Sequence, residues 1–512
     1  MMKSCMRTLL ALLLALSLLA TGLALAEAEL EIGEIAQDAA IEAVEAPEAL
    51  PELALEDGAL AIEDVEPDAV EAEVNAPEEV KINKANFPAA DFRKYVKAHF
   101  DTDGNGSLSE AEIEEARDIE LRSYDDFMAG VGELKKCSTL KGIEYLTNLV
   151  YLWCPGCNID TMDLSRNTQL ENLNCSDNHL TALDLSKNRK LWRLDCYGNQ
   201  LKKLDLSKNT KLTELMCGNN PMKALDVRKN TKLKNLWCEE SQLSSLDVSR
   251  NKALKELGLY RNQLKKLDVS ANTKLEKLYL SYNQLKAIDL SKNARLEVLG
   301  LYGNKLTALD LSKNAKLADL NCGGNKLKKL DVSKNKKLVA LKCFENQLTA
   351  LDVSRNTALT EVRCQENRLS SLDVGKNTKL EMLSCTVNRL KRLDVSANTG
   401  LVVLGCSNNR LTALDVTANR KLELLDCSKN RLTALDVSKN KKLGYLIVDG
   451  NGIPSLDIAK CPALQKALKL EKRTSKGVVQ WGIQEEYGWD ARLSINADTK
   501  LTAGRKALYA GK

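Results

Sequence analysis

The sequence repeats itself with a fixed period from Leu149 onward, without an insertion or a deletion, and the starting leucines fall at 149, 170, 191 and so on to 443. Fifteen units follow one another and end at Ala463, and all share the frame LxxLx[CL]xxNxLxxLD[VL]SxNxx. One unit, residues 338–358, reads LVALKCFENQLTALDVSRNTA. Units of this kind bury their apolar side only by stacking on their neighbours. The period therefore predicts an elongated solenoid that binds partners, and it argues against a globular enzyme.

Each unit consists of two halves with nearly the same apolar spacing, counted here from its first leucine as position 1. Alternate residues of a strand point to the same side, so positions 4 and 6 face the core in the first half, and positions 14 and 16 in the second. We therefore expect a parallel β-sheet on one face and short strands or an extended ribbon on the other. Little helix is expected within the repeats.

Polar residues recur at three fixed positions. Asparagine occupies position 9 in thirteen repeats and position 19 in fourteen, where its amide can bond backbone groups in stacked turns. Aspartate occupies position 15 in all fifteen, from Asp163 to Asp457. Backbone hydrogen bonds of the following turn, together with nearby lysines and arginines, are expected to offset the repulsion within this row. A calcium ladder is the less favoured alternative, because the Gly-Gly turns of such sites are absent.

Cysteine occupies position 6 in two runs, from Cys154 to Cys238 and from Cys322 to Cys427, and leucine replaces it between them. The first run has five members and cannot pair fully within itself. Because leucine substitutes at the same place, the position is interpreted as a small apolar core site. We expect mostly free, buried thiols rather than disulfides or metal ligands.

A twelve-residue loop ahead of the repeats, DTDGNGSLSEAE at 101–112, fits a calcium-binding EF-hand loop at every diagnostic position. Gly106 permits the sharp turn, and apolar residues at helical spacing lie on both sides. The expected ligands are side-chain oxygens, one backbone carbonyl at position 7, a water-mediated contact at position 9 and a bidentate carboxylate at position 12: Asp101, Asp103, Asn105, Ser107, Ser109 and Glu112. Only one such loop is present, so weak affinity and a structural role at the solenoid's end are expected.

Residues 1–80 differ sharply from the rest of the chain. Residues 1–26 have the basic start, apolar run and small-x-small ending of a secretory signal peptide, with no second apolar segment long enough to span a membrane. Residues 27–80 contain 19 Asp or Glu and no Lys or Arg, which predicts a disordered spacer. Because residues 1–26 carry +2 and this spacer −19, the total of +4 leaves +21 for residues 81–512. The spacer either keeps the protein soluble or folds back on the basic repeats.

Aromatic residues between 149 and 463 lie only at positions 2 to 8, and ten of these eleven fall in the first ten repeats. Exposed aromatic residues grouped on one face are typical of binding sites, although β-propensity alone is the competing explanation. The predicted contact surface consists of Tyr151, Trp153, Trp192, Tyr197, Trp237, Tyr260, Tyr279, Tyr282, Tyr302 and Phe344. The expected partner is a protein or glycan on a host or bacterial cell surface.

Several functions find little support in the sequence. The two histidines, His99 and His179, have no catalytic or metal-ligand partner at motif spacing, so no enzyme is predicted. No nucleic-acid motif occurs, and we expect a monomer. Lysine-rich turns form a basic edge, which suggests the alternative of a structural envelope component held by charge. Residues 464–512, with strands expected at GVVQWGIQ and ARLSIN and with Trp481 and Trp489 as core anchors, are predicted to cap the last repeat.

The layout of 81–139, with its calcium loop, followed by LKGIEYLTNL and the repeats of 140–463, resembles secreted bacterial leucine-rich-repeat proteins of the internalin type that carry an EF-hand before the array. The resemblance implies a leucine-rich-repeat solenoid with a small helical cap. It also implies adhesion or recognition at a cell surface, without naming a ligand. This chain lacks the anchor of surface-attached members, so we expect it to be secreted, or loosely associated with the cell wall.

Overall fold

The computed structural model describes residues 79–121, 138–485, 488–503 and 507–509. The predicted signal peptide and all but the last two residues of the predicted acidic spacer lie outside these ranges. Residues from Glu79 onward belong to one compact unit. No helix among the described residues is both long enough and apolar enough to cross a membrane.

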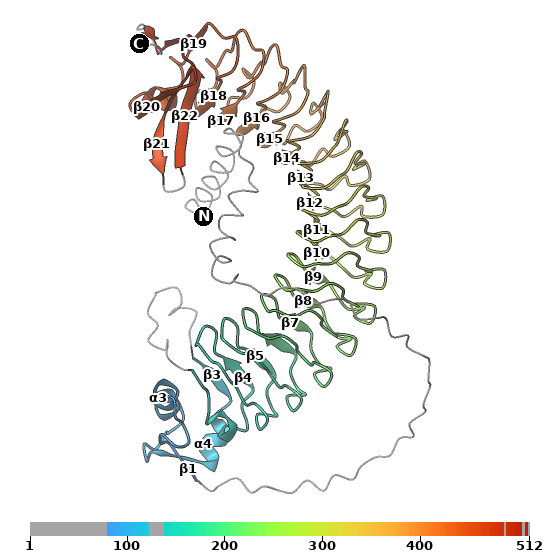
Figure 1. Ribbon diagram of the computed structural model, residues 1–512, viewed down its shortest axis with the longest axis vertical. Helices are drawn as coiled ribbons and strands as arrows, with labels where there is room; N and C mark the ends of the chain where they lie inside the picture. The colour runs from blue at the N-terminus through green and yellow to red at the C-terminus, as the bar shows by residue number, and fades with distance from the viewer. Residues whose placement is uncertain (1–78, 122–137, 486–487, 504–506, 510–512) are drawn as a thin grey trace, which may run out of the picture. The chain divides into compact units, whose positions relative to one another are not determined.

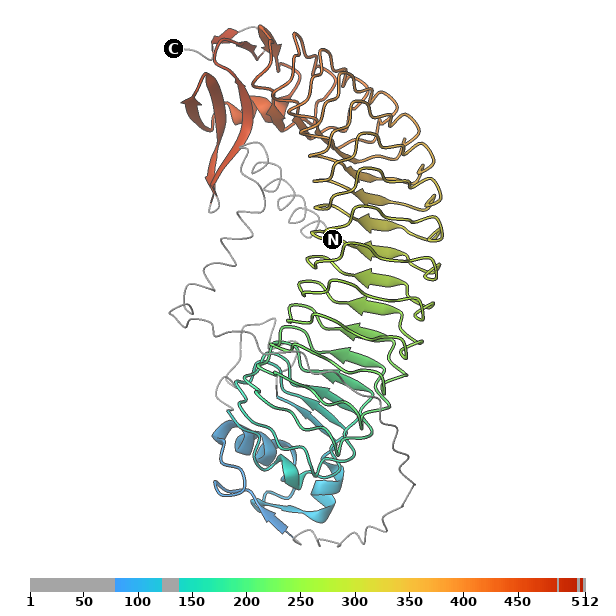
Figure 2. The same ribbon diagram turned by 45° about the vertical axis from the view of Figure 1, so that its right-hand side comes forward.

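One short strand from each repeat, together with one strand that precedes the repeats, forms a continuous parallel ladder. Figures 1 and 2 show this ladder along the inner side of the curved repeat stack. Neighbours pair in constant register, each residue with its equivalent in the next repeat, as in Leu278 with Leu299. The strands are β3 (Asp118–Glu120), β4 (Tyr151–Trp153), β5 (Asn172–Asn174), β6 (Arg193–Asp195), β7 (Glu214–Met216), β8 (Asn235–Trp237), β9 (Glu256–Gly258), β10 (Lys277–Tyr279), β11 (Val298–Gly300), β12 (Asp319–Asn321), β13 (Ala340–Lys342), β14 (Glu361–Arg363), β15 (Met382–Ser384), β16 (Val403–Gly405), β17 (Leu424–Asp426) and β18 (Tyr445–Ile447). The predicted leucine-rich-repeat solenoid is confirmed.

Each repeat strand covers positions 3 to 5, so its middle residue points inward and its outer two point away. In β10, for instance, Leu278 is completely buried while Lys277 and Tyr279 are half-buried. Leucines at position 1 and the cysteines or leucines at position 6 complete this side of the core. We define the strand face as the outward residues at positions 3 and 5, together with the turn residues at positions 7 and 8.

The opposite side of the repeats is an extended ribbon without strand pairing between successive repeats, one of the two forms expected. Pairing occurs on that side where the ends of the stack are covered. Thr139 forms a parallel bridge with Thr161 of the first repeat. In the last repeat β19 (Ser455–Asp457) pairs with β23 (Lys500–Thr502), which pairs with β24 (Ala507–Tyr509).

The N-terminal cap consists of β1 (Glu79–Lys81), α3 (Ala90–His99), β2 (Ser107–Ser109), α4 (Glu110–Glu115) and the short helix η1 (Ile143–Tyr145). Phe92 and Val96 of α3 and Ile113 of α4 belong to the same buried core as Leu149 of the first repeat. The chain leaves α4 directly into β3, the first strand of the ladder. The calcium loop is therefore joined to the edge of the repeat sheet by a few residues.

The C-terminal cap contains α6 (Pro462–Ala467), β20 (Glu471–Ser475), β21 (Val478–Glu485) and β22 (Gly488–Asn496), and both strands expected from the sequence are confirmed. Strand β22 pairs with β18 in parallel, and β21 and β20 follow in antiparallel order. The cap thus occupies the exposed edge of the last repeat strand, which would otherwise be open to another chain. The side chains of Trp481 and Trp489 lie outside the described residues.

Candidate partner-binding face and calcium site

The asparagines at position 9 hold the turn that follows each strand. Asn304 is typical: its Nδ2 donates to the carbonyls of Leu280 and Leu301, at 2.8 and 3.1 Å, and more weakly to that of Tyr302. Its Oδ1 accepts the backbone N–H of Leu285 at 3.0 Å. Every hydrogen-bonding group of the side chain is therefore used on backbone groups of its own repeat and the one before. The predicted structural ladder is confirmed.

The asparagines at position 19 link the ribbon side instead. Asn293 Nδ2 donates to the carbonyls of Val269 and Asn272, both at 3.0 Å, while its Oδ1 is buried and has no partner among the described residues. The same pattern recurs at each described asparagine of this row from Asn167 to Asn440. Side-chain amides therefore supply the links that a backbone ladder supplies on the strand side.

The aspartates at position 15 each begin the turn of the ribbon side. Asp184 Oδ1 accepts the backbone N–H of Ser186 at 2.9 Å, and its neighbours repeat this bond. The bond lowers the pKa of Asp184 below its ordinary value. In Asp226 a bidentate contact with Arg228, together with the turn bond, lowers the pKa to about 2. The expected compensation by turn hydrogen bonds is confirmed.

The position-6 cysteines are buried, and those from Cys175 to Cys427 are free thiols. Burial raises the pKa of Cys175, Cys196 and Cys322, that of Cys322 to about 12, so these thiols stay protonated. Leu259, Leu280 and Leu301 occupy equivalent buried places. The row is an apolar core element, as the sequence predicted.

The calcium loop brings three of its expected ligands together. One carboxylate oxygen from each of Asp101, Asp103 and Glu112 lies within 4.8 Å of the others. Two further expected ligands, Asn105 and Ser107, lie in the same loop. Asn105 Nδ2 donates to Asp103 Oδ2 at 2.9 Å, and the Ser107 N–H donates to Asn105 Oδ1 at 2.7 Å. Gly106 has a φ of +83°, which only glycine adopts easily, and its N–H donates to Asp101.

Glu112 is held in the position of a closing ligand by four short contacts. Its Oε1 accepts from the N–H and hydroxyl of Thr102 at 2.6 and 2.8 Å. Its Oε2 accepts from the N–H and hydroxyl of Ser109, both at 2.9 Å. Burial alone would raise the pKa of Glu112, but these bonds outweigh it and lower the pKa to about 2. The carboxylate is therefore held in one orientation in its charged form.

The sequence did not reveal a partner strand for this loop. Strand β2 covers loop positions 7 to 9 and pairs in antiparallel fashion with β1, matching Val80 with Leu108. Both side chains are buried. Strand β1 therefore takes the place that a second EF-hand loop usually fills, and it begins at Glu79, just ahead of the predicted domain boundary at 81. The only signal in the sequence was a short β-branched stretch, 79–83, at the end of the acidic segment.

The ten predicted partner-binding aromatics all lie on or beside strands β4 to β13, but they form separate clusters rather than one surface. Tyr151 and Trp153 neighbour each other in β4, with ring centroids 6.1 Å apart. The Tyr302 ring packs against those of Tyr282 and Phe344, with ring centroids 5.0 and 5.2 Å away. The remaining members are Trp192, which is 37% exposed just before β6, the position-7 residues Tyr197 and Tyr260, and a pair formed by Trp237 and Tyr279.

The pair formed by Trp237 and Tyr279 spans three strands. Their ring centroids lie 5.2 Å apart although β9 runs between β8 and β10. Gly258 of β9 creates the space, because a Cβ built on it would lie 2.2 Å from the Trp237 ring. The Trp237 ring therefore lies over the backbone of the next repeat and presents a broad apolar patch on the strand face.

Charged residues of the strand face pair with one another across neighbouring strands. Lys277 contacts Glu256 at 2.8 Å, and Arg193 contacts Glu214 at 3.3 Å. These pairs are partly exposed, so each is worth under about 1 kcal/mol. His179 is exposed near Asp160, and His99 stacks on Tyr95 of the same helix. Neither histidine joins a group with catalytic geometry among the described residues.

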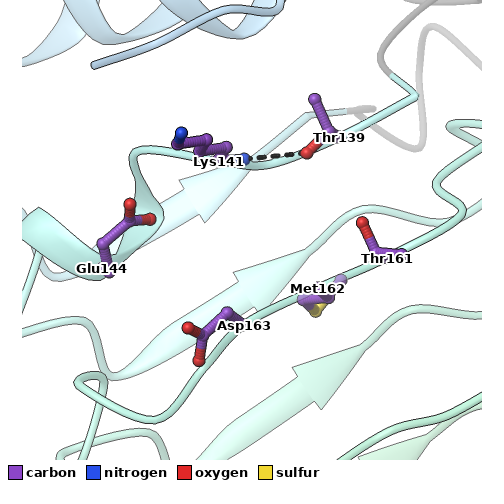
Figure 3. A pocket seen from close by; sticks show the side chains of 6 residues that line it. All are labelled: Thr139, Lys141, Glu144, Thr161, Met162 and Asp163. Atoms are coloured by element: carbon purple, nitrogen blue, oxygen red, sulfur yellow. Dashed lines mark hydrogen bonds between the residues drawn. The ribbon is translucent and has the colours of Figure 1, made fainter. Parts of the chain in front are cut away.

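A shallow cavity of about 330 Å³ lies on the ribbon side, between the N-terminal cap and the first repeat (Figure 3). The bridged residues Thr139 and Thr161 both line it, together with acidic and basic side chains and one methionine. The lining residues are Thr139, Lys141, Glu144, Thr161, Met162 and Asp163. None of the aromatic clusters or calcium-loop residues contributes to it.

Comparison with solved structures identifies the family. The functional domain of InlJ from Listeria monocytogenes, described as including a cysteine ladder, is 31% identical to this chain. The match covers 81% of this chain and 88% of that domain, with a TM-score of 0.67. The chain belongs to the internalin-like leucine-rich-repeat proteins. This chain also has a row of cysteines, one at position 6 in eleven of its repeats. As a member of this family, it is a protein-interaction scaffold.

Two more distant structures share the fold with this internalin-like chain. A leucine-rich-repeat protein from Leptospira interrogans is 23% identical over 61% of this chain and 89% of its own, with a TM-score of 0.55. Internalin InlF from Listeria monocytogenes is 23% identical over 72% of this chain and 97% of its own, with a TM-score of 0.52. No protein-family profile matches the sequence, and a search of curated proteins finds no match.

Proposed function

We propose that this protein is an extracellular recognition or adhesion scaffold that binds its partner through the aromatic clusters of the strand face. The observation that carries the proposal is the patch of Trp237 and Tyr279 over Gly258. Large rings at the centre of a contact dominate binding energy at protein interfaces. A stacked solenoid keeps such rings in fixed positions, so little conformational entropy is lost on binding.

The proposal is tested with fluorescently labelled protein on host cells, mucus glycoproteins and bacterial cell walls. A variant with Trp153, Trp192, Trp237 and Tyr279 changed to serine should bind at least about 30-fold more weakly, because each central ring contributes about 2 kcal/mol or more. Circular dichroism should show that the variant keeps its fold. Equal binding by both proteins, abolished by moderate salt, would contradict the proposal and favour an envelope component held by the basic turns.

A glycine substitution offers a finer test that leaves every ring in the chain. In Gly258→Ala the new methyl group must displace the Trp237 ring, because the two would otherwise lie 2.2 Å apart. We expect binding to weaken about 10-fold, since the Trp237 ring leaves its place beside Tyr279 although no apolar side chain is removed. The matched control is Gly300→Ala at the same position of β11. There the new methyl group would lie 3.3 Å from Ser281 Oγ and 3.5 Å from Tyr279 Cδ1, an ordinary contact distance that leaves the Tyr279 ring in place. Similar binding by both variants would argue that the patch is not in contact with the partner.

We further propose that the loop at 101–112 binds calcium and stabilises the N-terminal cap. Asp101, Asp103 and Glu112 supply three convergent carboxylates, and pairing of β1 with β2 holds the loop in register. Extracellular calcium sites work with dissociation constants of about 0.1 to 1 mM. Bound calcium would neutralise these charges next to the edge of the repeat sheet.

A further inference from the structure

A second feature of the strand face lies at position 7, one turn residue beyond each strand. Tyr197, Gly218, Glu239 and Tyr260 occupy this position in four successive repeats. The turns of successive repeats stay in register because the N–H at position 8 of one repeat donates to the position-7 carbonyl of the next. The N–H of Asn219, for example, donates to the Glu239 carbonyl at 2.7 Å. At about 4.8 Å per rung, the backbone positions of Tyr197 and Tyr260 lie about 14 Å apart, with Glu239 between them.

Glu239 is buried without a counter-charge. It is only 9% exposed, and its Oε2 has no hydrogen-bond donor within reach among the described residues. Its carboxylate leans back over Gly218, since a Cβ built on that glycine would lie 2.7 Å from Glu239 Cδ and 2.8 Å from Oε2. Burial raises the pKa of Glu239. Its own backbone N–H opposes this effect, while the charges of Glu240 and Asp195 add to it.

Two basic side chains of the same strand face, Arg261 and Arg193, are engaged with other groups. Arg261 contacts Glu240 Oε1 at 3.2 Å and lies over the Tyr282 ring, and Arg193 contacts Glu214. Asp195 is also half-buried, and its pKa is likewise raised by burial. A buried carboxylate without a counter-charge is strongly destabilising. A positively charged ligand at this place would remove that cost.

The flanking rings complete a site for a cation. Tyr197 and Tyr260 are half-buried, and the negative charges of Glu239 and Glu240 act on both hydroxyl groups. Aromatic faces attract cations, and more strongly where water is excluded. The carboxylates are not arranged for a metal ion, because the calcium loop is the one convergent three-ligand group in the described part of the chain.

We infer that Tyr197, Glu239 and Tyr260 form a binding site for a primary ammonium group, namely a lysine side chain presented by the protein partner. The inference rests on the proposed function and identifies one contact within it. Lysine fits better than arginine, because a compact ammonium needs only one carboxylate oxygen, whereas a guanidinium favours two parallel acceptors.

The test uses the full chain and the peptide acetyl-Gly-Gly-Lys-Gly-Gly-amide, with saturation-transfer NMR to measure weak binding. The same peptide with Nε-acetyl-lysine lacks the charge and should bind at least about 10-fold more weakly. Glu239→Gln should weaken binding of the lysine peptide by a similar factor, whereas Glu240→Gln, the adjacent carboxylate, should leave it within about threefold. Because residues 27–80 also carry many carboxylates, the difference between variants is the decisive quantity.

Thermal unfolding distinguishes a binding role from a structural one. Glu239→Gln removes an unpaired buried charge, so its melting temperature should equal or exceed that of the parent protein. Tyr197→Leu, which keeps an apolar side chain, should weaken peptide binding about two- to fivefold. Equal binding of the charged and acetylated peptides, or undiminished binding by Glu239→Gln, would overturn the inference. If cell-surface binding still depends on Trp237 in that case, the proposed function stands without this contact.

Discussion

Replacing Asn304 by alanine is expected to lower the free energy of unfolding by about 3 kcal/mol or more. The substitution leaves the buried N–H of Leu285 without a partner. It also removes one of the two amide donors to the carbonyls of Leu280 and Leu301, which keep Asn283 and Asn325 respectively, and each of these lost bonds costs about 1 kcal/mol. Each buried backbone group that loses its partner costs about 1 to 3 kcal/mol. Urea unfolding followed by circular dichroism measures the loss. Hydrogen exchange should show that the opened amides cluster in the repeats on either side of Asn304.

The control for this prediction is the second asparagine row. Asn293→Ala removes two donated bonds but no accepted one, because Asn293 Oδ1 has no partner among the described residues. Its effect should be smaller, about 2 kcal/mol. The exposed neighbour Lys305 should tolerate alanine within about 0.5 kcal/mol. If Asn293→Ala and Asn304→Ala lowered the free energy of unfolding equally, the bond that Asn304 Oδ1 accepts would contribute nothing measurable to stability.

Calcium is expected to stabilise the protein, and Glu112→Gln should abolish this effect. At 10 mM calcium and a dissociation constant of about 0.1 to 1 mM, linkage gives about 1.4 to 2.7 kcal/mol. Glutamine cannot supply two charged oxygens, so calcium affinity should fall on the order of 100-fold. Differential scanning calorimetry with calcium and with a chelator measures the shift. The cap and the repeats share one core, so the stabilisation should extend into the first repeats.

The neighbouring residue Glu110 provides the matched control, because it is exposed and contributes no ligand to the loop. Glu110→Gln should retain the calcium response unchanged. Glu112→Gln also weakens the bonds from Thr102 and Ser109, so its melting temperature without calcium should be somewhat lower. A calcium response that survives in Glu112→Gln would remove the loop from consideration as the calcium site.

Much of this fold could be predicted from the sequence because each repeat contacts mainly its two neighbours. A residue type that recurs at one position of the repeat therefore meets itself in the next repeat, and the rows of Asn304, Asp184 and Cys322 could be assigned roles from their spacing alone. The calcium site at 101–112 could be predicted for a related reason, since its expected ligands come from a single short segment.

Features that depend on differences between repeats, or on segments distant along the chain, were not predictable in this way. Strand β1 pairs with β2 across the whole of α3 and the first half of the predicted calcium loop, matching Val80 to Leu108, and no periodicity marks it. The aromatic residues were found from the sequence, but their division into clusters depends on the size of the side chains one and two repeats away.

The solenoid and its inward and outward positions follow from the amino-acid sequence alone, because hydrophobic burial and a fixed period favour one arrangement that buries the rows of leucines. The calcium site at 101–112 is a prediction from the same sequence. The position of Trp237 over Gly258, and the burial of Glu239 beside Gly218 without a counter-charge, emerge only in the assembled stack. Stacking places equivalent residues of successive repeats about 4.8 Å from each other. The space left by a glycine then sets the orientation of its neighbour's side chain, and no pattern within a single repeat encodes that orientation.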